Sequence, residues 1–331
     1  MNTGTRVVVT GGCGFVGSHL VERLVERGAE VTVFDLAPPP PDQAWLADRV
    51  RYVTADVRDP TSIGAVITPD VHTVYHLGGV VGVDRYLVEP LDVIDVTIGG
   101  TRHVLERAAQ VGAKVVLAST SEVYGKNAAV PWAEDADRVL GATGTDRWVY
   151  GSSKAVAEHM TFAFVRQRGL RAAIVRYFNV YGPRQRPAYV ISRSIHRALR
   201  GLPPERYDSG RQTRCFTFVA DAVEATIRAG QRPAADGQAV NIGSAVETPV
   251  AAALELIARI TGVAGPVVTL DTAAGLGPAY QDIDRRVPDV AKAIRLLGWR
   301  HRTPLRAGLE QTVDWAKRNP WWQQVRLEGF G

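Results

Sequence analysis

A tyrosine and a lysine stand four residues apart at Tyr150 and Lys154. This spacing places both side chains on one face of a helix, so the ammonium group can lie near the phenol. A free tyrosine, with a pKa of about 10, is a poor base at neutral pH, but a neighbouring positive charge favours the phenolate. The pair could therefore take the proton of a hydroxyl group while a hydride leaves the same carbon. Because this spacing also occurs by chance on many helices, the assignment depends on the rest of the chain.

Two hydroxyl groups and a carboxylate follow one of the apolar runs. The run over 114–119 predicts a buried strand, and Thr120, Ser121 and Glu122 come directly after it. Ligands of open α/β sheets bind at the carboxyl ends of the strands, so we expect these side chains at the site of chemistry. The alternative for Glu122 is a purely structural carboxylate, buried and hydrogen-bonded.

A glycine-rich segment near the start of the chain has the pattern of a phosphate-binding turn. Its glycines recur at every third residue, after a predicted strand over 6–10 and before a predicted helix over 18–27. Glycine there permits a tight turn, close approach of the backbone to a pyrophosphate and close helix packing, and the helix N-terminus supplies N–H donors. The residues assigned to this turn are Gly11, Gly14, Phe15, Val16 and Gly17.

Asp35 ends the next predicted strand, over 31–35. A carboxylate at this position accepts hydrogen bonds from the adenosine ribose hydroxyls and repels a 2′-phosphate. Leu36 and Ala37 offer no arginine that would reverse this preference, so the sequence favours NAD over NADP as the cofactor. Three further residues are assigned to the cofactor site, namely Asp56, Val57 and Leu77.

Short β-branched runs alternate with helical patterns in the first half of the chain, which predicts βαβ units and a parallel sheet. The first six strands are predicted at 6–10, 31–35, 50–53, 73–77, 114–119 and 172–176, with helices at 18–27, 90–111 and 152–167. Strands at 216–219 and 239–242 are expected to return to the sheet, and helices at 251–261 and 290–297 to belong to a second lobe. The predicted fold is therefore α/β, a Rossmann-type doubly wound parallel sheet with a smaller interleaved C-terminal substrate lobe.

We expect the lobe boundary after residue 178, where glycine and proline begin to interrupt the regular alternation. Residues 1–178 would form the NAD-binding Rossmann domain, to which residues 216–244 return. Residues 179–215 and 245–331 would form the substrate lobe. Four consecutive prolines at 38–41 predict a surface loop after the second strand.

The composition is that of a globular protein, since 46% of the 331 residues are hydrophobic and 22% are charged. The formal net charge of +5 is compatible with nucleic-acid binding, but no run of five like charges occurs and only five of the 39 basic residues are lysines. Arginine suits bidentate contacts with phosphate or carboxylate, so we expect a small anionic ligand and no nucleic acid. We expect no membrane partner either, because no apolar stretch reaches about 18 residues.

The cysteine and histidine content predicts no metal site. Cys13 and Cys215 are too few for a metal cage, and the seven histidines show no ligand spacing. Without a disulfide framework or the pattern of a signal peptide, we expect a cytoplasmic protein.

Taken together, the motifs resemble those of extended short-chain dehydrogenase/reductases, in the group of nucleotide-sugar epimerases, dehydratases and decarboxylases. They follow one another in order over nearly the whole chain. The motifs lie at 10–17, 76–79, 119–125, 150–154, 176–185, 212–216, 286–289 and 297–299. The resemblance implies an NAD-dependent enzyme and a homodimer formed through the helices at 90–111 and 152–167.

The segment 119–125 distinguishes members of this group. Sugar 4,6-dehydratases carry an Asp-Glu pair where this chain has Ser121 and Glu122, and simple 4-epimerases usually lack the carboxylate. The segment resembles that of UDP-glucuronate decarboxylases. Residues 147–150 and 280–286 are similar to the decarboxylase domain of the lipid A aminoarabinose pathway.

The resemblance implies a role for each candidate residue. Tyr150 would be the base, Lys154 would tune it and hold the nicotinamide ribose, and Thr120 would hydrogen-bond the 4-oxygen of the sugar. Glu122 and Arg286 would place the sugar carboxylate and organise reprotonation once it has left. The implied catalytic residues are Thr120, Ser121, Glu122, Tyr150, Lys154 and Arg286, and the implied substrate contacts are Tyr86, Asn179, Tyr207, Arg214, Tyr280 and Arg286.

Our hypothesis is an NAD-dependent decarboxylase that converts UDP-glucuronate to a UDP-4-ketopentose, to UDP-xylose or to both. One alternative is a UDP-sugar 4-epimerase. Another, from a different class, is a dinucleotide-sensing binding protein on the same fold without turnover. Gly79, Thr97 and Asp208 depart from the usual residues of the group, but none of them alters Tyr150 or Glu122.

Overall fold

Seven parallel strands form the main sheet of the computed structural model, which describes residues 4–271 and 282–325. Their order is β11-β6-β5-β4-β1-β2-β3, so the direction of winding reverses between β1 and β4. The carboxyl ends of the strands at such a reversal are where open α/β sheets bind ligands. The strands are β1 (Arg6–Thr10), β2 (Glu30–Asp35), β3 (Val50–Thr54), β4 (Thr73–His76), β5 (Lys114–Thr120), β6 (Ala172–Tyr177) and β11 (Gln238–Ile242).

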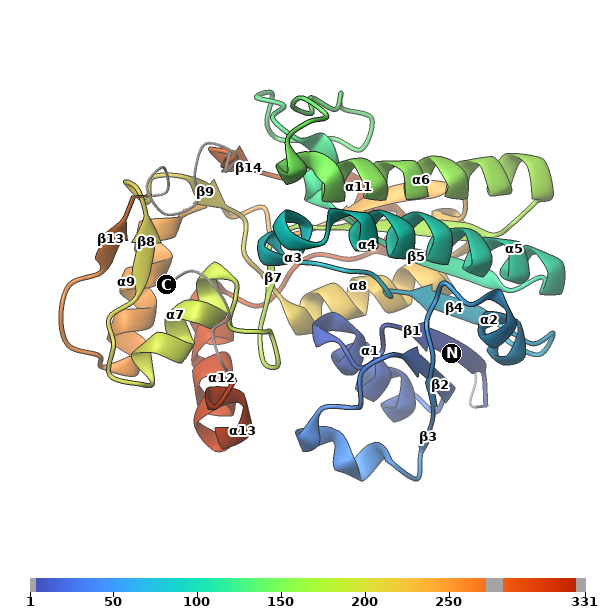
Figure 1. Ribbon diagram of the computed structural model, residues 1–331, viewed down its shortest axis with the longest axis horizontal. Helices are drawn as coiled ribbons and strands as arrows, with labels where there is room; N and C mark the ends of the chain where they lie inside the picture. Colours follow the sequence, from blue (N-terminus) through green and yellow to red (C-terminus); the bar gives the residue numbers. More distant parts are fainter. Residues whose placement is uncertain (1–3, 272–281, 326–331) are drawn as a thin grey trace.

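Helices cover both faces of this sheet (Figure 1). One face carries α2 (Pro60–Val66), α5 (Thr101–Val111) and α6 (Val149–Arg168), and the other carries α1 (Phe15–Glu26) and α8 (Val219–Gln231). Successive side chains of a strand point to opposite faces, which explains the all-apolar strand sequences. In β1, Val7 and Val9 are buried in the core cluster that includes α1 and α8, whereas Val8 is buried in the one that includes α2 and α5.

The predicted strands and helices at these positions are confirmed, with shifts of a few residues at their ends. α1 begins at Phe15, earlier than predicted, because Gly14 serves as its N-cap. The predicted helix at 90–111 consists of α4 (Pro90–Asp95), a π-helical stretch over Val96–Gly100 and α5. The proline segment forms a loop up to Pro40, and Pro41 begins a 3₁₀ helix, η1 (Pro41–Leu46), as its fixed φ allows.

The strand predicted at 216–219 does not return to the main sheet. Its residues form β10 (Thr217–Phe218), which pairs only with β7 (Val180–Tyr181). The edge position next to β6 belongs to β11 instead. Residues after Phe218 continue as α8, whose alanines and valines recur at helical spacing and are buried against the sheet.

The other elements gather at one end of the sheet, on the left in Figure 1. Helices lie there together with short strands, and two small sheets of the described residues have the orders β12-β9-β14 and β13-β8. The division of the chain into two lobes at the boundaries given above stays a prediction. The strands at this end are β8 (Glu205–Tyr207), β9 (Thr213–Arg214), β12 (Thr248–Pro249), β13 (Val268–Leu270) and β14 (Arg285–Arg286). The helices are α7 (Val190–Ala198), α9 (Val250–Thr261), α12 (Leu305–Arg318) and, directly after it, α13 (Pro320–Gln323). Helix α11 (Ala291–Leu297) lies instead beside α8 and β11.

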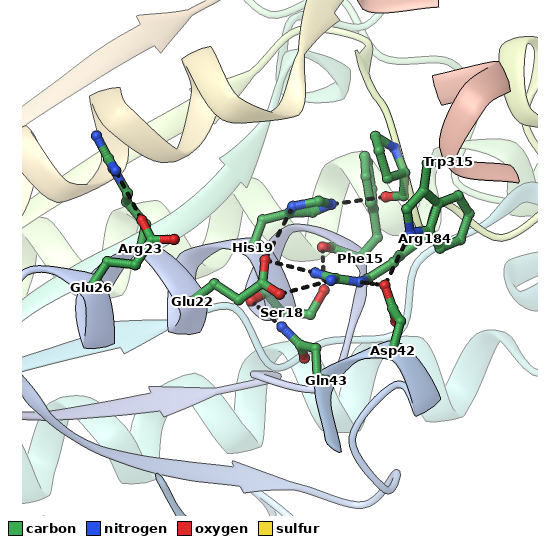
Figure 2. A network of polar contacts seen from close by, with 11 residues as sticks. Phe15, Ser18, His19, Glu22, Arg23, Glu26, Asp42, Gln43, Arg184 and Trp315 are labelled. Atoms are coloured by element: carbon green, nitrogen blue, oxygen red, sulfur yellow. Dashed lines mark hydrogen bonds and ion pairs between the residues drawn. The ribbon is translucent and has the colours of Figure 1, made fainter. Parts of the chain in front are cut away.

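A buried arginine joins the helix of the glycine turn to segments far along the chain (Figure 2). Arg184 has a left-handed backbone with φ of 67°, and its side chain is 8% exposed. Its guanidinium contacts Glu22 of α1 and Asp42 of η1, each at 2.8 Å. The indole N–H of Trp315 in α12 donates to the same Asp42 carboxylate at 3.0 Å. The segment after β2 is therefore held from two directions by later parts of the chain.

Neither a membrane span nor a metal cluster occurs among the described residues. None of their helices is both long and apolar enough to span a bilayer. Over the same residues, no group of three or more histidine, cysteine, aspartate or glutamate side chains is arranged to hold a metal ion.

Candidate active site

The glycine turn leaves the N-terminus of α1 open to a ligand. A Cβ atom on Gly17 would lie 2.0 Å from the carbonyl oxygen of Gly11, so the two segments can pack only without a side chain. Gly11 itself has φ of 69° and packs against Gly78. The N-cap is Gly14, and no side chain caps the first N–H groups of the helix. These free donors and the helix dipole fit the pyrophosphate of NAD, with Phe15 and Val16 in the first turn.

Asp35 is fixed beside this turn. Its carboxylate accepts hydrogen bonds from the backbone N–H of Cys13 at 2.9 Å and of Ala37 at 3.0 Å. A carboxylate has room for further donors, and Asp35 is only half-buried, so it fits the ribose hydroxyls of an adenosine. The other three predicted cofactor residues lie along the same edge: Asp56 after β3, Val57 in the core and Leu77 after β4.

The Asp56 carboxylate is already occupied by a neighbour. Arg58 donates to it through Nε and Nη2, and these hydrogen bonds lower the pKa of Asp56. Arg58 also contacts Asp92 at 2.7 Å. The predicted cofactor contact of Asp56 therefore stays a prediction, and its carboxylate would have to share its acceptors with Arg58.

Tyr150 and Lys154 lie on the buried side of α6, facing the end of β5. The ammonium group of Lys154 donates to the carbonyl oxygen of Ala118 at 3.0 Å, and burial lowers the pKa of Lys154 to about 8, against the opposing influence of Glu158. Burial raises the pKa of Tyr150, Tyr189 and Glu122 add to this, and a hydrogen bond with Thr120 opposes it. We predicted that Lys154 lowers the pKa of Tyr150, but the surroundings of Tyr150 in the described residues raise this pKa.

Glu122 lies between two arginine side chains. Its carboxylate contacts the guanidinium of Arg147 at 2.6 Å and also that of Arg286. The Glu122 side chain is 17% exposed, and those of Arg147 and Arg286 are 5% and 9% exposed. Burial alone would raise the pKa of Glu122, but the two arginines outweigh it and bring the pKa down to about 2. Glu122 is therefore a carboxylate anion at neutral pH.

Local structure sets the position of this carboxylate. Glu122 lies in the 3₁₀ helix η3 (Ser121–Tyr124), whose N-cap, Thr120, accepts a hydrogen bond from the Glu122 N–H at 3.2 Å. Ser121 is buried at the first position of η3. Arg147 belongs to a second 3₁₀ helix, η4 (Asp146–Trp148), which leads directly into α6. The turn η3 directly follows β5, and η4 directly precedes α6, so a strand of the main sheet and a long helix position the two turns.

The substrate-side tyrosine of the prediction lies in this cluster. Tyr86 of α3 (Val83–Val88) is buried, and its ring packs in one apolar cluster with Tyr150. The Arg147 guanidinium lies 5.8 Å from the centroid of the Tyr86 ring. The Tyr86 hydroxyl is buried without a hydrogen-bond partner among the described residues, a cost that a polar ligand would relieve.

Asn179 and Tyr207 lie in segments that lead away from this cluster. Asn179 has a left-handed backbone, and its side-chain oxygen is buried with no partner in the described part of the chain. The Tyr207 hydroxyl of β8 accepts a hydrogen bond from Arg193 at 3.1 Å. The substrate contacts of both residues stay predictions.

Arg214 supports the loop that precedes β14. Its guanidinium donates to the carbonyl oxygen of Ile283 at 2.7 Å and contacts the Asp282 carboxylate at 2.6 Å. β9, which carries Arg214, also pairs in parallel with β14, which carries Arg286. Arg214 thus helps to position Arg286, and its predicted contact with the substrate stays a prediction. The predicted contact Tyr280 lies outside the described residues.

A buried polar network underlies the catalytic helix. Glu158, one turn after Lys154, accepts hydrogen bonds from Ser119 at 2.6 Å and from Arg176 at 2.6 and 2.9 Å. Arg176 also donates to the hydroxyl of Tyr124. Each of these groups is paired, so the network ties β5, α6 and β6 together at low energetic cost.

Sequence reasoning gave Arg286 a shared role with Glu122 but missed other neighbours of Glu122, Tyr150 and Tyr86. Arg147 precedes Tyr150 by three residues, a helical spacing that could have indicated it, and it is the second cation at Glu122. Tyr189, at the N-cap of α7, is close enough to influence the pKa of Tyr150, and Asp282 likewise influences the pKa of Tyr86. No local pattern points to the last two, because both come from distant segments.

Comparison with known proteins relates the whole chain to nucleotide-sugar enzymes. Residues 7–243 match the model of the NAD dependent epimerase/dehydratase family. The chain is 36% identical over 315 residues to a UDP-N-acetyl-alpha-D-glucosaminuronate decarboxylase of Bacillus cytotoxicus, covering 94% of this chain and 97% of that one. It is 33% identical over 319 residues to UDP-glucuronic acid decarboxylase 1 of Xenopus tropicalis, covering 95% and 72%.

Solved structures of similar proteins share the fold. The UDP-glucose 4-epimerase of Thermotoga maritima, solved with UDP-glucose, superposes with a TM-score of 0.87 at 29% identity, covering 96% of this chain and all of that one. MoeE5, solved with UDP-glucuronic acid and NAD, gives a TM-score of 0.83 at 32% identity, covering 95% and 99%.

Proposed function

The chain belongs to the NAD-dependent epimerase/dehydratase family, and we propose that it uses NAD to decarboxylate a UDP-linked sugar acid. The favoured substrate is UDP-glucuronate, and the product is a UDP-4-ketopentose, UDP-xylose or both. The observation that carries this proposal is the Glu122 carboxylate between Arg147 and Arg286, beside Tyr150.

The charge at this position supports an acidic substrate. Two guanidinium groups and one carboxylate leave one positive charge next to Tyr150, and this charge is partly shielded from water. Arginine binds carboxylates through paired hydrogen bonds, so a sugar carboxylate would complete the group. A neutral sugar would leave the charge unbalanced. The similarity to two sugar-acid decarboxylases supports the same reaction for this chain.

The residues of α6 and β5 would carry out the oxidation. NAD, when bound, accepts the hydride that leaves C4 of the sugar. Tyr150 would be the base that takes the proton of the 4-hydroxyl group, and Thr120, its hydrogen-bond partner, would hold the 4-oxygen. The first turn of α1 would hold the pyrophosphate, Asp35 the adenosine ribose and Lys154 the nicotinamide ribose. A ketone at C4 is the result.

Loss of carbon dioxide follows from the position of that ketone. The carboxylate is β to it, so the bond between C5 and C6 breaks, its electron pair passes through C5 to the 4-oxygen, and carbon dioxide leaves. Hydrogen bonds from the Tyr150 and Thr120 hydroxyls stabilise the negative charge that develops on this oxygen. Arg286 would place the carboxylate before it leaves, and C5 would then take up a proton from water. Release at this stage gives the UDP-4-ketopentose, whereas UDP-xylose requires that the reduced cofactor return the hydride to C4 and that the 4-oxygen regain its proton from Tyr150.

Product analysis tests the proposal directly. Purified protein with NAD and UDP-glucuronate should release carbon dioxide. The nucleotide sugar should be lighter by the mass of carbon dioxide for UDP-xylose, and by two further hydrogen atoms for the UDP-4-ketopentose. UDP-N-acetylglucosaminuronate, offered in a parallel assay, identifies the preferred sugar. Clean conversion of UDP-glucuronate to UDP-galacturonate without carbon dioxide would overturn decarboxylation and establish the alternative, a 4-epimerase.

The variant Glu122→Gln separates the two reactions further. It keeps the shape of the side chain but removes the charge that two arginines hold, so a decarboxylase should lose about 10²-fold or more in kcat, in the range of one lost electrostatic contact in an active site. An epimerase should retain most of its rate. Glu224→Gln is the matched control, because Glu224 pairs with Arg27 and Arg228 on the opposite face of the sheet.

The partner that we propose is a second copy of the chain. Val88 and Leu91, around the start of α4, are 77% and 73% exposed, and Val156 of α6 is 41% exposed. α4 and α6 pack against each other, so these apolar groups lie on one helical layer. Sedimentation should show a dimer for the natural chain and a monomer for Leu91→Glu; a monomeric natural chain would contradict the proposal.

A further inference from the structure

The two arginines that flank Glu122 have different surroundings. Arg147 contacts Glu122 at 2.6 Å, and its guanidinium lies 5.0 Å from the ring centroid of Trp148 and 5.8 Å from that of Tyr86. Two aromatic faces hold a planar guanidinium in one orientation. The short turn from Arg147 into α6 fixes its backbone as well. Arg147 is therefore aimed permanently at Glu122.

Arg286 approaches the same carboxylate from β14, which belongs to the last part of the chain. One of its terminal nitrogens contacts Glu122, but its Nε is buried with no hydrogen-bond partner among the described residues. A guanidinium has five N–H donors, so Arg286 retains donors for a second acceptor. No ring is recorded against its guanidinium in the described part of the chain, in contrast to Arg147. Arg286 is the arginine that can turn to an incoming carboxylate.

Binding of that carboxylate would disturb Glu122. Among the residues that the structure describes, four ionisable side chains from four elements face Glu122, namely Arg147 of η4, Arg286 of β14, Tyr86 of α3 and Tyr150 of α6. When Arg286 donates hydrogen bonds to a substrate carboxylate, its interaction with Glu122 becomes weaker. The substrate also brings a second negative charge close to Glu122. Both changes raise the pKa of a carboxyl group. Asp282, which also lies near Tyr86 and Arg147, adds a further negative charge.

We propose that Arg147 is a positioning residue, which keeps Glu122 charged and in place while Arg286 binds the carboxylate of the substrate. This role rests on the proposed function, because it requires an acidic substrate. Without Arg147, two carboxylates would compete for one guanidinium, and Glu122 would take up a proton at mildly acidic pH. Arg147 itself need not touch the sugar.

The pH dependence of kcat for Arg147→Met tests this role. In the natural enzyme Glu122 stays ionised across the assay range, so its titration causes no decrease of kcat at acidic pH (no acid limb of the pH profile). In the variant, kcat should fall roughly tenfold per pH unit below the new pKa of Glu122, as for any single essential ionisation, and recover toward pH 8. KM for the sugar acid should rise where Glu122 is ionised, because Glu122 then competes with the substrate carboxylate for Arg286. Arg147→Lys, which keeps the charge, should restore much of the natural profile.

Two controls show that the effect acts through Glu122. In the double variant Arg147→Met/Glu122→Gln the acid limb should disappear, because a glutamine does not titrate, and the two single effects should be non-additive. Arg27→Met removes a matched arginine, paired with Glu224 at 2.5 Å between α1 and α8, and should leave the profile unchanged. Arg147→Gln serves the same test if the methionine variant does not fold.

The outcomes separate this inference from the proposed function. A loss of kcat by the same factor at every pH, or an acid limb that persists in the double variant, would overturn the role of Arg147 and leave decarboxylation intact. Absence of carbon dioxide release by the natural enzyme would instead overturn the proposed function. The comparison of pH profiles can then still be made on whichever reaction of the sugar acid is observed.

Discussion

Gly151 lies against Glu122 so closely that a Cβ atom on residue 151 would stand 2.7 Å from the Glu122 carbonyl oxygen. The start of α6 and the 3₁₀ helix η3 are therefore packed backbone against backbone. Because Tyr150 precedes Gly151, the phenol and the Glu122 carboxylate are held in a fixed relation by main chain alone. A side chain at residue 151 would have to push the two apart.

Removal of the Tyr150 hydroxyl should abolish turnover but not cofactor binding. A positioned acid or base contributes about 10²–10⁴-fold to a rate, so Tyr150→Phe should lose at least about 10²-fold in kcat. The ring remains in its apolar cluster with Tyr86 and Val93, so the fold should persist. Stopped assays and NAD titration measure both effects. Unchanged biological activity of this variant would revive the interpretation as a binding protein without turnover.

Neutralisation of Asp35 should weaken NAD binding and reduce the preference of the protein for NAD over NADP. Hydrogen bonds to a charged group contribute about 1.5–3 kcal/mol, so Asp35→Asn should bind NAD roughly tenfold to a hundredfold more weakly. Calorimetric titration with both dinucleotides checks this. Asp56→Asn is the comparison, since Arg58 already occupies that carboxylate. Equal NAD affinity in Asp35→Asn and the natural chain would refute the assignment of the ribose contact.

Two glycine-to-alanine variants should have opposite effects. In Gly17→Ala the new methyl group would stand 2.0 Å from the Gly11 carbonyl oxygen, so the turn must move and NAD binding should be lost. At Gly64 of α2 a new methyl group would meet no atom within 4 Å, and Gly64→Ala should stabilise the protein by about 0.5–1 kcal/mol. Thermal unfolding with and without NAD distinguishes them. A Gly17→Ala protein that still binds NAD normally would contradict the predicted phosphate turn.

A half-buried histidine on α1, His19, should make the protein less stable in acid. Burial and Arg184 lower the pKa of His19 to about 4, from an ordinary value of 6.5. Between these values the unfolded chain binds a proton that the folded chain does not, so stability falls as pH drops from 6.5 to 4. His19→Gln should remove up to one proton from this dependence, or about 1.4 kcal/mol per pH unit. Urea unfolding at several pH values measures the slope, and an unchanged slope would show that His19 is ionised when folded.

The sheet was predictable because its strands are buried on both faces. β1, β4 and β5 are continuous apolar or β-branched runs, and such runs allow few other structures. The strand at 216–219 could not be assigned correctly from the same signal. A short apolar run shows that a segment is buried, but not which neighbour it pairs with, and β10 pairs with β7.

The catalytic helix and the glycine turn were predictable from spacing, whereas the ion pairs of the site were not. Tyr150 and Lys154 are one helical turn apart, so a local pattern contains their geometry. The contact between Glu122 and Arg286 joins residues 164 positions apart, and only the folded chain brings them together. Arg214 illustrates the same limit, since apart from the carbonyl oxygen of Thr213 its acceptors belong to residues 282–284.

The contacts of Arg184 and Trp315 determine how the chain can be divided. Glu22 and Asp42 belong to the part that would bind the dinucleotide, yet their partners are supplied by residue 184 and, for Asp42, also by residue 315. A fragment that ends at residue 178 would leave both carboxylates partly buried without a cation, which is strongly unfavourable. The dinucleotide half is therefore not a transferable module. Exchange of lobes between relatives would succeed only if these four side chains moved together.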